Sequence, residues 1–306
     1  MVVSVANLKK DKANKYARLK FALGFVKHDV EIQELLNYVH IDEKWFYLTK
    51  TNRKYYLIPG ETALDRKCKS KRFVTKVMFL AAVARPHFVG DTGTWWDGKI
   101  GTWPFVETVL AQRSSNNRSA GSPETKPITV TKDVYREFLQ GLACHRREVA
   151  DERPSRHDTA RQRPSLRHGV RRQVAYTLAE LAKQDWSISL APQPPNSRDT
   201  NILDLGFFAG IQSLQHQKSA RSIDELVAHV ADAFVEYPFE HLDRTFLTLQ
   251  SCLIETMKVN GDNTYKIPHM AKEKKQRLGI LPRNVVCPVD TFDAARAALV
   301  GTRVCC

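Results

Sequence analysis

Cysteines with the spacing of a disulfide framework or a metal site are missing from this chain of 306 residues. Its 6 cysteines, at positions 68, 144, 252, 287, 305 and 306, include no CxxC pair and no Cys/His cluster with the spacing of a zinc site. This pattern argues against a disulfide framework and against a zinc finger. Scattered unpaired cysteines are typical of a reducing compartment.

Long apolar runs are also missing. No stretch reaches the length of a transmembrane helix, and the opening segment MVVSVANLKKDKANKYARLK is too polar for a secretory signal. We therefore expect an intracellular protein that has no membrane partner.

Acidic residues are few compared with basic ones. The chain has 33 Asp and Glu against 47 Lys and Arg, which gives a formal net charge of +14 at pH 7. Such a balance favours a polyanionic partner, and nucleic acid is the commonest one. The alternative is a protein that is merely basic. Because 42% of the residues are hydrophobic, most of the chain should fold around a substantial core.

The hydrophobic pattern predicts an α/β protein. Strands expected early in the chain give way to helices, which favours a mixed central sheet with helices on both faces. The expected strands are 39–48, 54–60, 73–84 and 186–191, and the expected helices are 7–27, 131–142, 174–184, 201–217 and a long region from 222 to 259 that Asn260-Gly261 closes. Residues 86–128 are expected to be irregular, and the tail to be basic and polar.

One segment breaks the pattern. Residues 144–173 hold nine arginines and few apolar side chains. Such a composition does not support a buried strand, and it is typical of disorder. We interpret this segment as disordered or damaged, because a shifted reading frame or a mis-spliced intron would leave both flanks recognisable.

The stretch VHIDEKWFYL (39–48) places a carboxylate inside an apolar strand. On a strand, Asp42 shares one face with His40, Lys44 and Phe46. Burying a carboxylate is expensive unless it is paired or binds a metal. The alternative is that Asp42 lies at an exposed strand end.

A second acidic position occurs in NSRDTNILDLGFF, after a polar loop. Asp204 falls in the first turn of an apolar helix, where an acid can simply stabilise the helix dipole. Asp199 has an equally ordinary explanation as a cap or turn residue. If Asp42 and Asp204 meet at one edge of the sheet, their hard oxygen ligands suit Mg²⁺ or Mn²⁺.

Several motifs in co-linear order resemble the mariner-like transposases of plants and oomycetes. The motifs are VHIDEKWFYL, SKRFVTKVMFLAAVARP, WDGKIGTWPF, QPPNSRDTNILDLGFFAGIQSLQ and DNTYKIPHMAKEKKQRLGILP, with NKYARLKFAL resembling the helix before their catalytic domain. The resemblance covers nearly the whole chain. It implies an RNase H-like fold, three acidic residues that hold two Mg²⁺ (or Mn²⁺) ions, cleavage of DNA at transposon ends with strand transfer, and a homodimer.

The resemblance also implies which acids are involved. The first is Asp42 in HIDEKWF, and the third is Asp204 in NILDLGFF rather than Asp199. The best match for the second is Asp158 in SRHDTARQRP, although Thr159 stands in place of the family's Asn, and Arg163 lies near the position of its downstream His. The alternative, to which we give equal weight, is that Asp158 is a solvated residue of the Arg-rich segment.

The resemblance divides the chain into three parts. Residues 1–38 are expected to be a basic linker region, 39–217 the RNase H-like catalytic domain, and 218–306 a helical C-terminal extension with a basic tail. The family's helix-turn-helix domains have no counterpart, so we expect an N-terminally truncated enzyme in the nucleus. The competing hypothesis is an inactive transposon remnant that binds nucleic acid non-specifically. An RNase H-like nuclease acting on RNA hybrids is disfavoured, because the resemblance extends into the family's insertion and tail.

Overall fold

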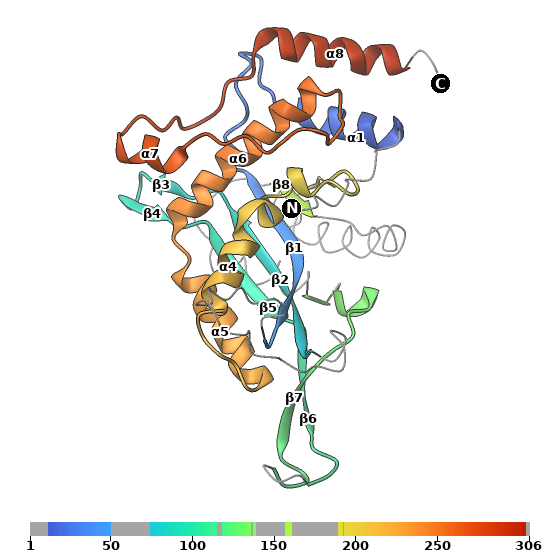
Figure 1. The fold of residues 1–306 in the computed structure, drawn as a ribbon, viewed down its shortest axis with the longest axis vertical. Coiled ribbons are helices and arrows are strands. Elements are labelled where there is room, and N and C mark those ends of the chain that lie inside the picture. The colour runs from blue at the N-terminus through green and yellow to red at the C-terminus, as the bar shows by residue number, and fades with distance from the viewer. Residues whose placement is uncertain are drawn as a thin grey trace, which may run out of the picture.

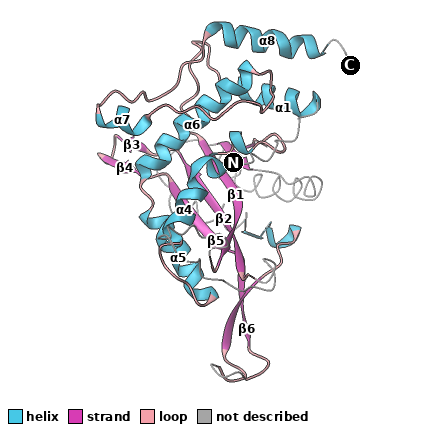
Figure 2. Ribbon diagram, viewed as in Figure 1, coloured by secondary structure: helices cyan, strands magenta, loops and turns pink. Residues whose placement is uncertain are grey.

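The structure, a computed structural model, combines a central β-sheet with helices that follow it in the chain (Figures 1 and 2). It describes residues 12–49, 74–114, 118–135, 137–138, 157–160, 189–191 and 193–303, and of residues 157–160, 189–190 and 302–303 it describes the backbone only. The strands are β1 (Tyr38–Tyr47), β2 (Lys76–Ala84), β3 (His87–Val89), β4 (Thr94–Trp96), β5 (Lys99–Pro104), β6 (Val106–Leu110), β7 (Pro123–Pro127), β8 (His157–Ala160) and β9 (Ser189–Leu190). The helices are α1 (Lys12–Leu23), α4 (Phe208–Gln215), α5 (Ile223–Glu236), α6 (Phe239–Lys258), α7 (Lys272–Arg277) and α8 (Val289–Arg303).

The central sheet has the strand order β5-β2-β1-β8-β9. β2 runs antiparallel to both β1 and β5, whereas β8 is parallel to β1 and β9 is parallel to β8. The sheet is therefore mixed, as expected. β1 lies at its centre and is paired along both edges, and its residues 39–42 and Phe46 are buried.

Alternation along β1 and β2 divides the apolar side chains between two cores. Phe46, Val77 and Phe79 join the large core beneath the helices, whereas Val39 and Leu80 join a smaller core on the opposite face. Because side chains alternate along a strand, Asp42 lies on the same face as Phe46. The expectation that Asp42 shares a face with His40, Lys44 and Phe46 is consistent with this division.

Helices cover the large core. Figure 1 shows α4, α5 and α6 lying across one face of the sheet, with α8 beyond α6. The region expected as one long helix from 222 to 259 is two helices, because Pro238 cannot donate a backbone hydrogen bond and begins α6 as its N-cap. Ser222 caps α5, since its hydroxyl accepts the backbone N–H of Glu225 at 3.1 Å.

The smaller core is also covered by helical residues. Residues 132–135 and 137–138 are helical, as the expected helix 131–142 requires. The ring of Phe138 packs on Phe105, with ring centroids 4.3 Å apart. Helices therefore contribute to both faces of the sheet.

The expectation that residues 86–128 are irregular was wrong. This insertion contains β3 to β7, of which β5 joins the main sheet beside β2. Aromatic pairs stabilise the β3–β4 hairpin, since Trp96 packs edge-on against His87 and Trp95 stacks on Phe239 of α6. The β6–β7 hairpin projects from the body (Figure 1). Short strands separated by Gly and Pro gave too weak an alternation to detect.

Several boundaries also differ from expectation. α1 ends at Leu23, before Gly24, and is shorter than the expected helix 7–27, of which residues 7–11 lie outside the described part. The strand expected at 186–191 is only Ser189–Leu190 within the described residues. The strand expected at 54–60 and the helix expected at 174–184 lie outside the described residues.

The C-terminal part is helical, as expected. Asn260 and Gly261 follow α6 with φ of 50° and 84°, a left-handed conformation that ends the helix. The tail that was expected to be basic and polar contains α7 and the longer α8. None of the helices in the described ranges is both long and apolar enough to span a bilayer.

Candidate active site

Asp42 is a buried carboxylate at the middle of the central strand. It is aligned with Ala81 of β2, and only 1% of its surface is exposed. The alternative of an exposed strand end is therefore wrong. A carboxylate at such a depth requires a compensating donor or cation.

Asp204 lies in the helical turn that follows an extended residue. Asn201 has φ −114° and ψ 115°, and a π-helical turn over Leu203–Phe207 leads into α4. The side-chain oxygen of Asn201 accepts the backbone N–H of Leu203 at 3.1 Å, which caps this turn. The helix expected at 201–217 therefore begins after Asn201, and Asp204 is in its first turn as expected.

One amide group joins the two carboxylates. Nδ2 of Asn201 donates to Oδ2 of Asp42 at 2.7 Å and lies 3.3 Å from Oδ2 of Asp204. Because Oδ1 of Asn201 is occupied by the N–H of Leu203, the NH₂ end of the amide must face the acids. The structure therefore brings Asp42 and Asp204 together.

Asn201 was not identified from the sequence. The available signal was an Asn three residues before an acid at the start of an apolar helix, which is typical of a helix cap. Local sequence predicts the cap, but it does not predict that the free end of the amide reaches a strand 159 residues away in the chain.

His40 lies two residues before Asp42 on the same strand. It is buried, and its ring packs edge-on against Phe246 with centroids 5.4 Å apart. Burial lowers the pKa of His40 to about 3, so the imidazole is neutral at physiological pH. His40 therefore adds no positive charge beside the two acids.

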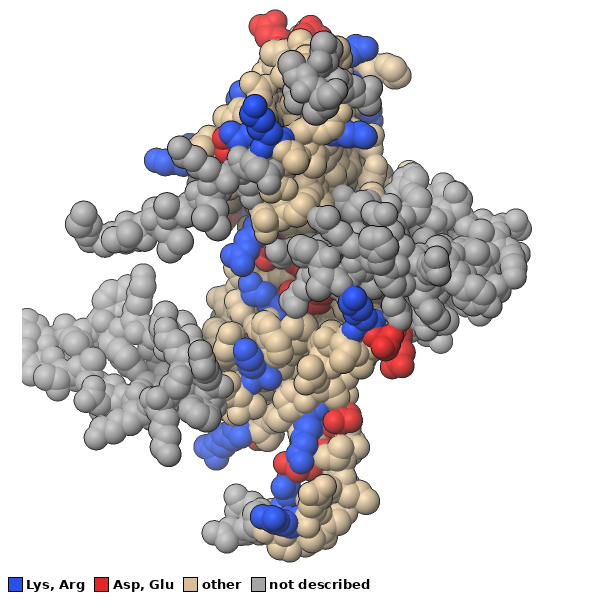
Figure 3. Space-filling view, turned by 90° about the vertical axis from the view of Figure 1, so that its right-hand side faces the viewer, with Lys and Arg blue, Asp and Glu red and all other residues tan. Residues whose placement is uncertain are grey.

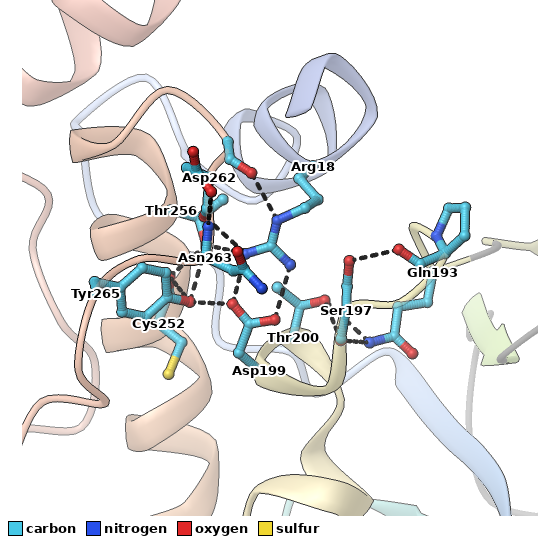
Figure 4. Close-up of polar contacts among 12 residues, drawn as sticks. Arg18, Gln193, Ser197, Asp199, Thr200, Cys252, Thr256, Asp262, Asn263 and Tyr265 are labelled. Carbon is cyan, nitrogen blue, oxygen red and sulfur yellow. Dashed lines mark hydrogen bonds and ion pairs between the residues drawn. The ribbon is translucent and has the colours of Figure 1, made fainter. Parts of the chain in front are cut away.

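Asp199 has a different partner from Asp204. Its carboxylate forms a bidentate pair with the guanidinium of Arg18 in α1, with distances of 2.8 and 2.5 Å (Figure 4). Burial raises the pKa of Asp199, but hydrogen bonds and charge from Arg18 outweigh burial and hold the pKa below its usual value. Asp199 therefore pairs with Arg18 and not with the Asp42–Asp204 group.

Asp158 lies on a strand. Its backbone is in β8, and in the register of β8 with β1 it is aligned with Val39, three residues before Asp42. His157–Ala160 therefore pair with the central strand, and the rest of the segment 144–173, interpreted from its composition as disordered or damaged, lies outside the described residues. The side chain of Asp158 lies outside the described part, and its role as second acid stays a prediction.

Two carboxylates in contact with one amide could share a divalent cation, since carboxylate oxygens are the ligands that Mg²⁺ and Mn²⁺ prefer. Among the residues whose side chains are described, no group of three or more His, Cys, Asp or Glu gathers as a metal cluster. A third acidic ligand would therefore have to come from the rest of the chain.

No protein-family model and no curated protein matches this chain at the level of sequence. Solved structures of the Mos1 mariner transposase do match the fold. The Mos1 paired-end complex with Mn matches with a TM-score of 0.59 and 17% identity over 87% of this chain and 68% of that chain. The paired-end complex with the left transposon end matches with a TM-score of 0.57 and 18% identity over 85% of this chain and 67% of that chain.

The isolated catalytic domain of Mos1 gives the same result. It matches with a TM-score of 0.52 and 15% identity, over 85% of this chain and 100% of that chain. At such identities the likeness shows the fold alone. This chain therefore has the mixed α/β fold that the hydrophobic pattern predicted, and it is RNase H-like, as the resemblance implied, in a form similar to the catalytic domain of Mos1.

Proposed function

We propose that this chain is the catalytic domain of a mariner-like DNA transposase of the plant and oomycete type. The proposed reaction is metal-dependent cleavage of DNA at transposon ends, followed by strand transfer into target DNA. The observation that carries the proposal is the contact of Asp42 and Asp204 with the same amide of Asn201. The nuclear location and a homodimer on paired DNA ends belong to this proposal too.

The residues fit a divalent metal. Asp42 is buried, so its charge needs a cation or strong donors, and Asp204 supplies a second oxygen next to the same donor. Asp42 and Asp204 would hold Mg²⁺ or Mn²⁺, with Asp158 as the proposed third ligand. Paired ions of this kind activate a water or a 3′-hydroxyl and stabilise the leaving oxygen in phosphodiester displacement.

The protein's own groups prepare this site. The amide of Asn201 holds the two carboxylate oxygens close to one another before any ion arrives. The buried ring of His40 remains neutral, so it does not compete with a cation for the acids. Rigid placement of the ligands matters for catalysis, because a metal enzyme whose ligands are loosely held has a much lower rate.

Basic side chains favour DNA as the partner. Figure 3 shows Lys and Arg at intervals along the length of one face of the molecule. The exposed helix α7 adds a further basic segment, with the sequence KEKKQR. Phosphate contacts of this type bind DNA without sequence preference and weaken steeply as salt rises.

The proposal is tested by nicking of supercoiled plasmid with Mn²⁺ or Mg²⁺. We expect activity that requires the metal and is lost in Asp42→Asn and in Asp204→Asn. Asp293→Asn is the matched control, because it removes one carboxylate from an exposed position of α8. Nicking that persists in both site variants would assign the activity to another site or to a contaminant.

The second candidate function is an inactive remnant that binds nucleic acid through charge. The arginine-rich composition around Asp158 favours it, because this is the segment expected to supply the second acid. Retention of salt-sensitive DNA binding without nicking or Mn²⁺ binding would support the remnant.

A further inference from the structure

Arg18 of α1 is a buried cation that is distant in sequence from Asp204 of the candidate site. It is 0% exposed, and arginine is almost never buried to this extent unless it is paired. The residue that pairs with it, Asp199, lies 181 positions later and five residues before Asp204. The pair therefore connects α1 to the segment that carries one acid of the candidate site.

The geometry of the pair is directional. Nη1 of Arg18 donates to Oδ1 of Asp199 at 2.8 Å, and Nη2 donates to Oδ2 at 2.5 Å. A planar guanidinium that makes two parallel hydrogen bonds fixes the orientation of a carboxylate as well as its distance. The hydroxyl of Tyr265 donates to Oδ2 of Asp199 at 2.5 Å and restricts it further.

The remaining donors of Arg18 hold the end of α6. Nε donates to the carbonyl of Gly261 at 2.7 Å, and Nη2 donates to the carbonyl of Asp262 at 3.1 Å. Lys15, one turn earlier in α1, forms an ion pair with Asp262. Figure 4 shows Arg18 between the Asp262 segment on one side and Asp199 on the other.

A braced turn leads from Asp199 to the candidate site. Asp199 is in a 3₁₀ turn in which the N–H of Thr200 donates to the carbonyl of Ser197, and that of Asn201 to the carbonyl of Arg198, both at 3.1 Å. The side chain of Gln193 donates to the hydroxyl of Thr200 at 3.0 Å. With so little freedom between Asp199 and Asn201, the orientation of one is transmitted to the other.

We propose that Arg18 is a positioning residue for the Asp42–Asp204 site, because it holds through Asp199 the turn that aims the amide of Asn201 at both carboxylates. The inference rests on the proposed function in so far as it predicts metal affinity. It also predicts that displacement of α1 loosens the two acids.

Stability alone is a weak explanation for this pair. Replacement of a buried ion pair by apolar residues of similar volume is often neutral or stabilising. An outer residue that orients metal ligands, in contrast, typically changes metal affinity by about 10- to 100-fold when it is mutated. The two roles therefore differ in a measurable quantity.

The experiment measures Mn²⁺ binding to the full chain by electron paramagnetic resonance. We expect Arg18→Lys to weaken Mn²⁺ binding by about tenfold or more, because lysine cannot make the bidentate contact. Arg85→Lys is the matched control. Arg85 is also 0% exposed and is ion-paired, with Asp243 at 3.0 Å, but none of its hydrogen bonds reaches the turn before Asp204. The control should bind Mn²⁺ as the unmodified chain does.

A double variant separates positioning from folding. Arg18→Met with Asp199→Leu removes both charges and retains apolar volume, so we expect a folded protein whose Mn²⁺ affinity stays weak. Unmodified affinity in this folded variant, or in a folded Arg18→Lys protein, would overturn the inference.

A readout without metal distinguishes this inference from the proposed function. We expect Arg18→Lys, but not Arg85→Lys, to speed hydrogen exchange of the backbone amides between Thr200 and Leu205. If the unmodified chain binds no Mn²⁺, the proposed function fails. The exchange rates then still decide the role of Arg18, because unchanged protection in Arg18→Lys would refute it.

Discussion

Asn201 and Asp42 are 159 residues apart in the chain, and Nδ2 of one lies 2.7 Å from Oδ2 of the other. The same nitrogen is 3.3 Å from Asp204. The amide thereby offsets part of the repulsion between two neighbouring carboxylates. This arrangement makes the residues before Asp204 part of the candidate site.

The first prediction concerns the charge between the two acids. Asn201→Asp places a third carboxylate beside Asp42 and Asp204, and we expect repulsion from these two acids to raise the pKa of the introduced carboxyl group. At low pH such an acid is protonated and neutral, so it does not repel its neighbours in the folded state. Its stability contribution is lost as pH rises through that pKa. The variant should therefore become less stable relative to the unmodified chain between pH 4 and pH 7.

Thermal unfolding at several pH values, with and without Mn²⁺, measures this effect. Mn²⁺ should raise the unfolding temperature of Asn201→Asp more than that of the unmodified chain. Asn201→Ala is the companion variant, and loss of its hydrogen bond to a charged group should cost about 1.5–3 kcal/mol. An Asn201→Asp protein whose relative stability does not change with pH would contradict the proximity of the three groups.

The second prediction concerns His40. Its pKa is about 3 in the folded chain because of burial, against an ordinary value of 6.5. Between these values the unfolded chain takes up a proton that the folded chain does not, so acid favours unfolding. The expected loss of stability from this one residue is about 1 kcal/mol for each pH unit from 6.5 down to 4.

Urea unfolding at pH 7, 6, 5 and 4 measures the contribution of His40. His40→Leu removes the titrating group, and we expect it to lose less stability on acidification than the unmodified chain does. Identical pH profiles for the two proteins would show that folding does not lower the pKa of His40.

The third prediction concerns Asp199. Its pKa is held below the usual value, chiefly because Arg18 outweighs the effect of burial, so its contribution is present above pH 4 and is lost as pH falls through the lowered pKa. Asp199→Asn leaves Arg18 buried without its charged partner and should cost about 3–5 kcal/mol at pH 7. Tyr265→Phe is the matched control, because it removes only one hydroxyl donor from the same carboxylate.

Chemical denaturation at pH 7 and at pH 3 tests the assignment. The difference between the unmodified chain and Asp199→Asn should shrink at the lower pH. A difference of the same size at both values would mean that the Arg18–Asp199 pair is not the source of the stability.

The fourth prediction concerns the contact of α1 with the end of α6. A Cβ added at Gly261 would lie 2.0 Å from the carbonyl oxygen of Lys15, and the φ of Gly261 is +84°. Gly279 is the matched control, because its φ is also positive, at +68°, yet no atom lies within 4 Å of an added Cβ. Alanine at position 279 should cost about 1–2 kcal/mol from the left-handed backbone alone.

Alanine at position 261 should cost more than that, because α1 must also shift. Thermal unfolding of Gly261→Ala and Gly279→Ala measures the difference. Gly261→Ala should also weaken Mn²⁺ binding if α1 positions the acids. Equal effects of the two substitutions would indicate that α1 does not approach Gly261 as closely as the structure shows.

Part of this architecture could be predicted from local sequence. Alternation in VHIDEKWFYL is sufficient to put Asp42 on a strand beside His40 and opposite Val39. The apolar run 73–84 predicts the neighbouring strand, and Asp204 is recognisable as an acid at a helix start. The insertion 86–128 escaped prediction because its strands are short and interrupted by Gly and Pro.

The sequence by itself determined the strand that carries Asp42, the helix start that carries Asp204, and the basic character that favours DNA, because periodicity and composition are local properties. Only the tertiary structure decided that Asn201 links the two acids and that Arg18 pairs with Asp199 rather than with solvent. Those contacts span 159 and 181 residues. They depend on the order of strands in the sheet and on the docking of α1, which no local pattern encodes.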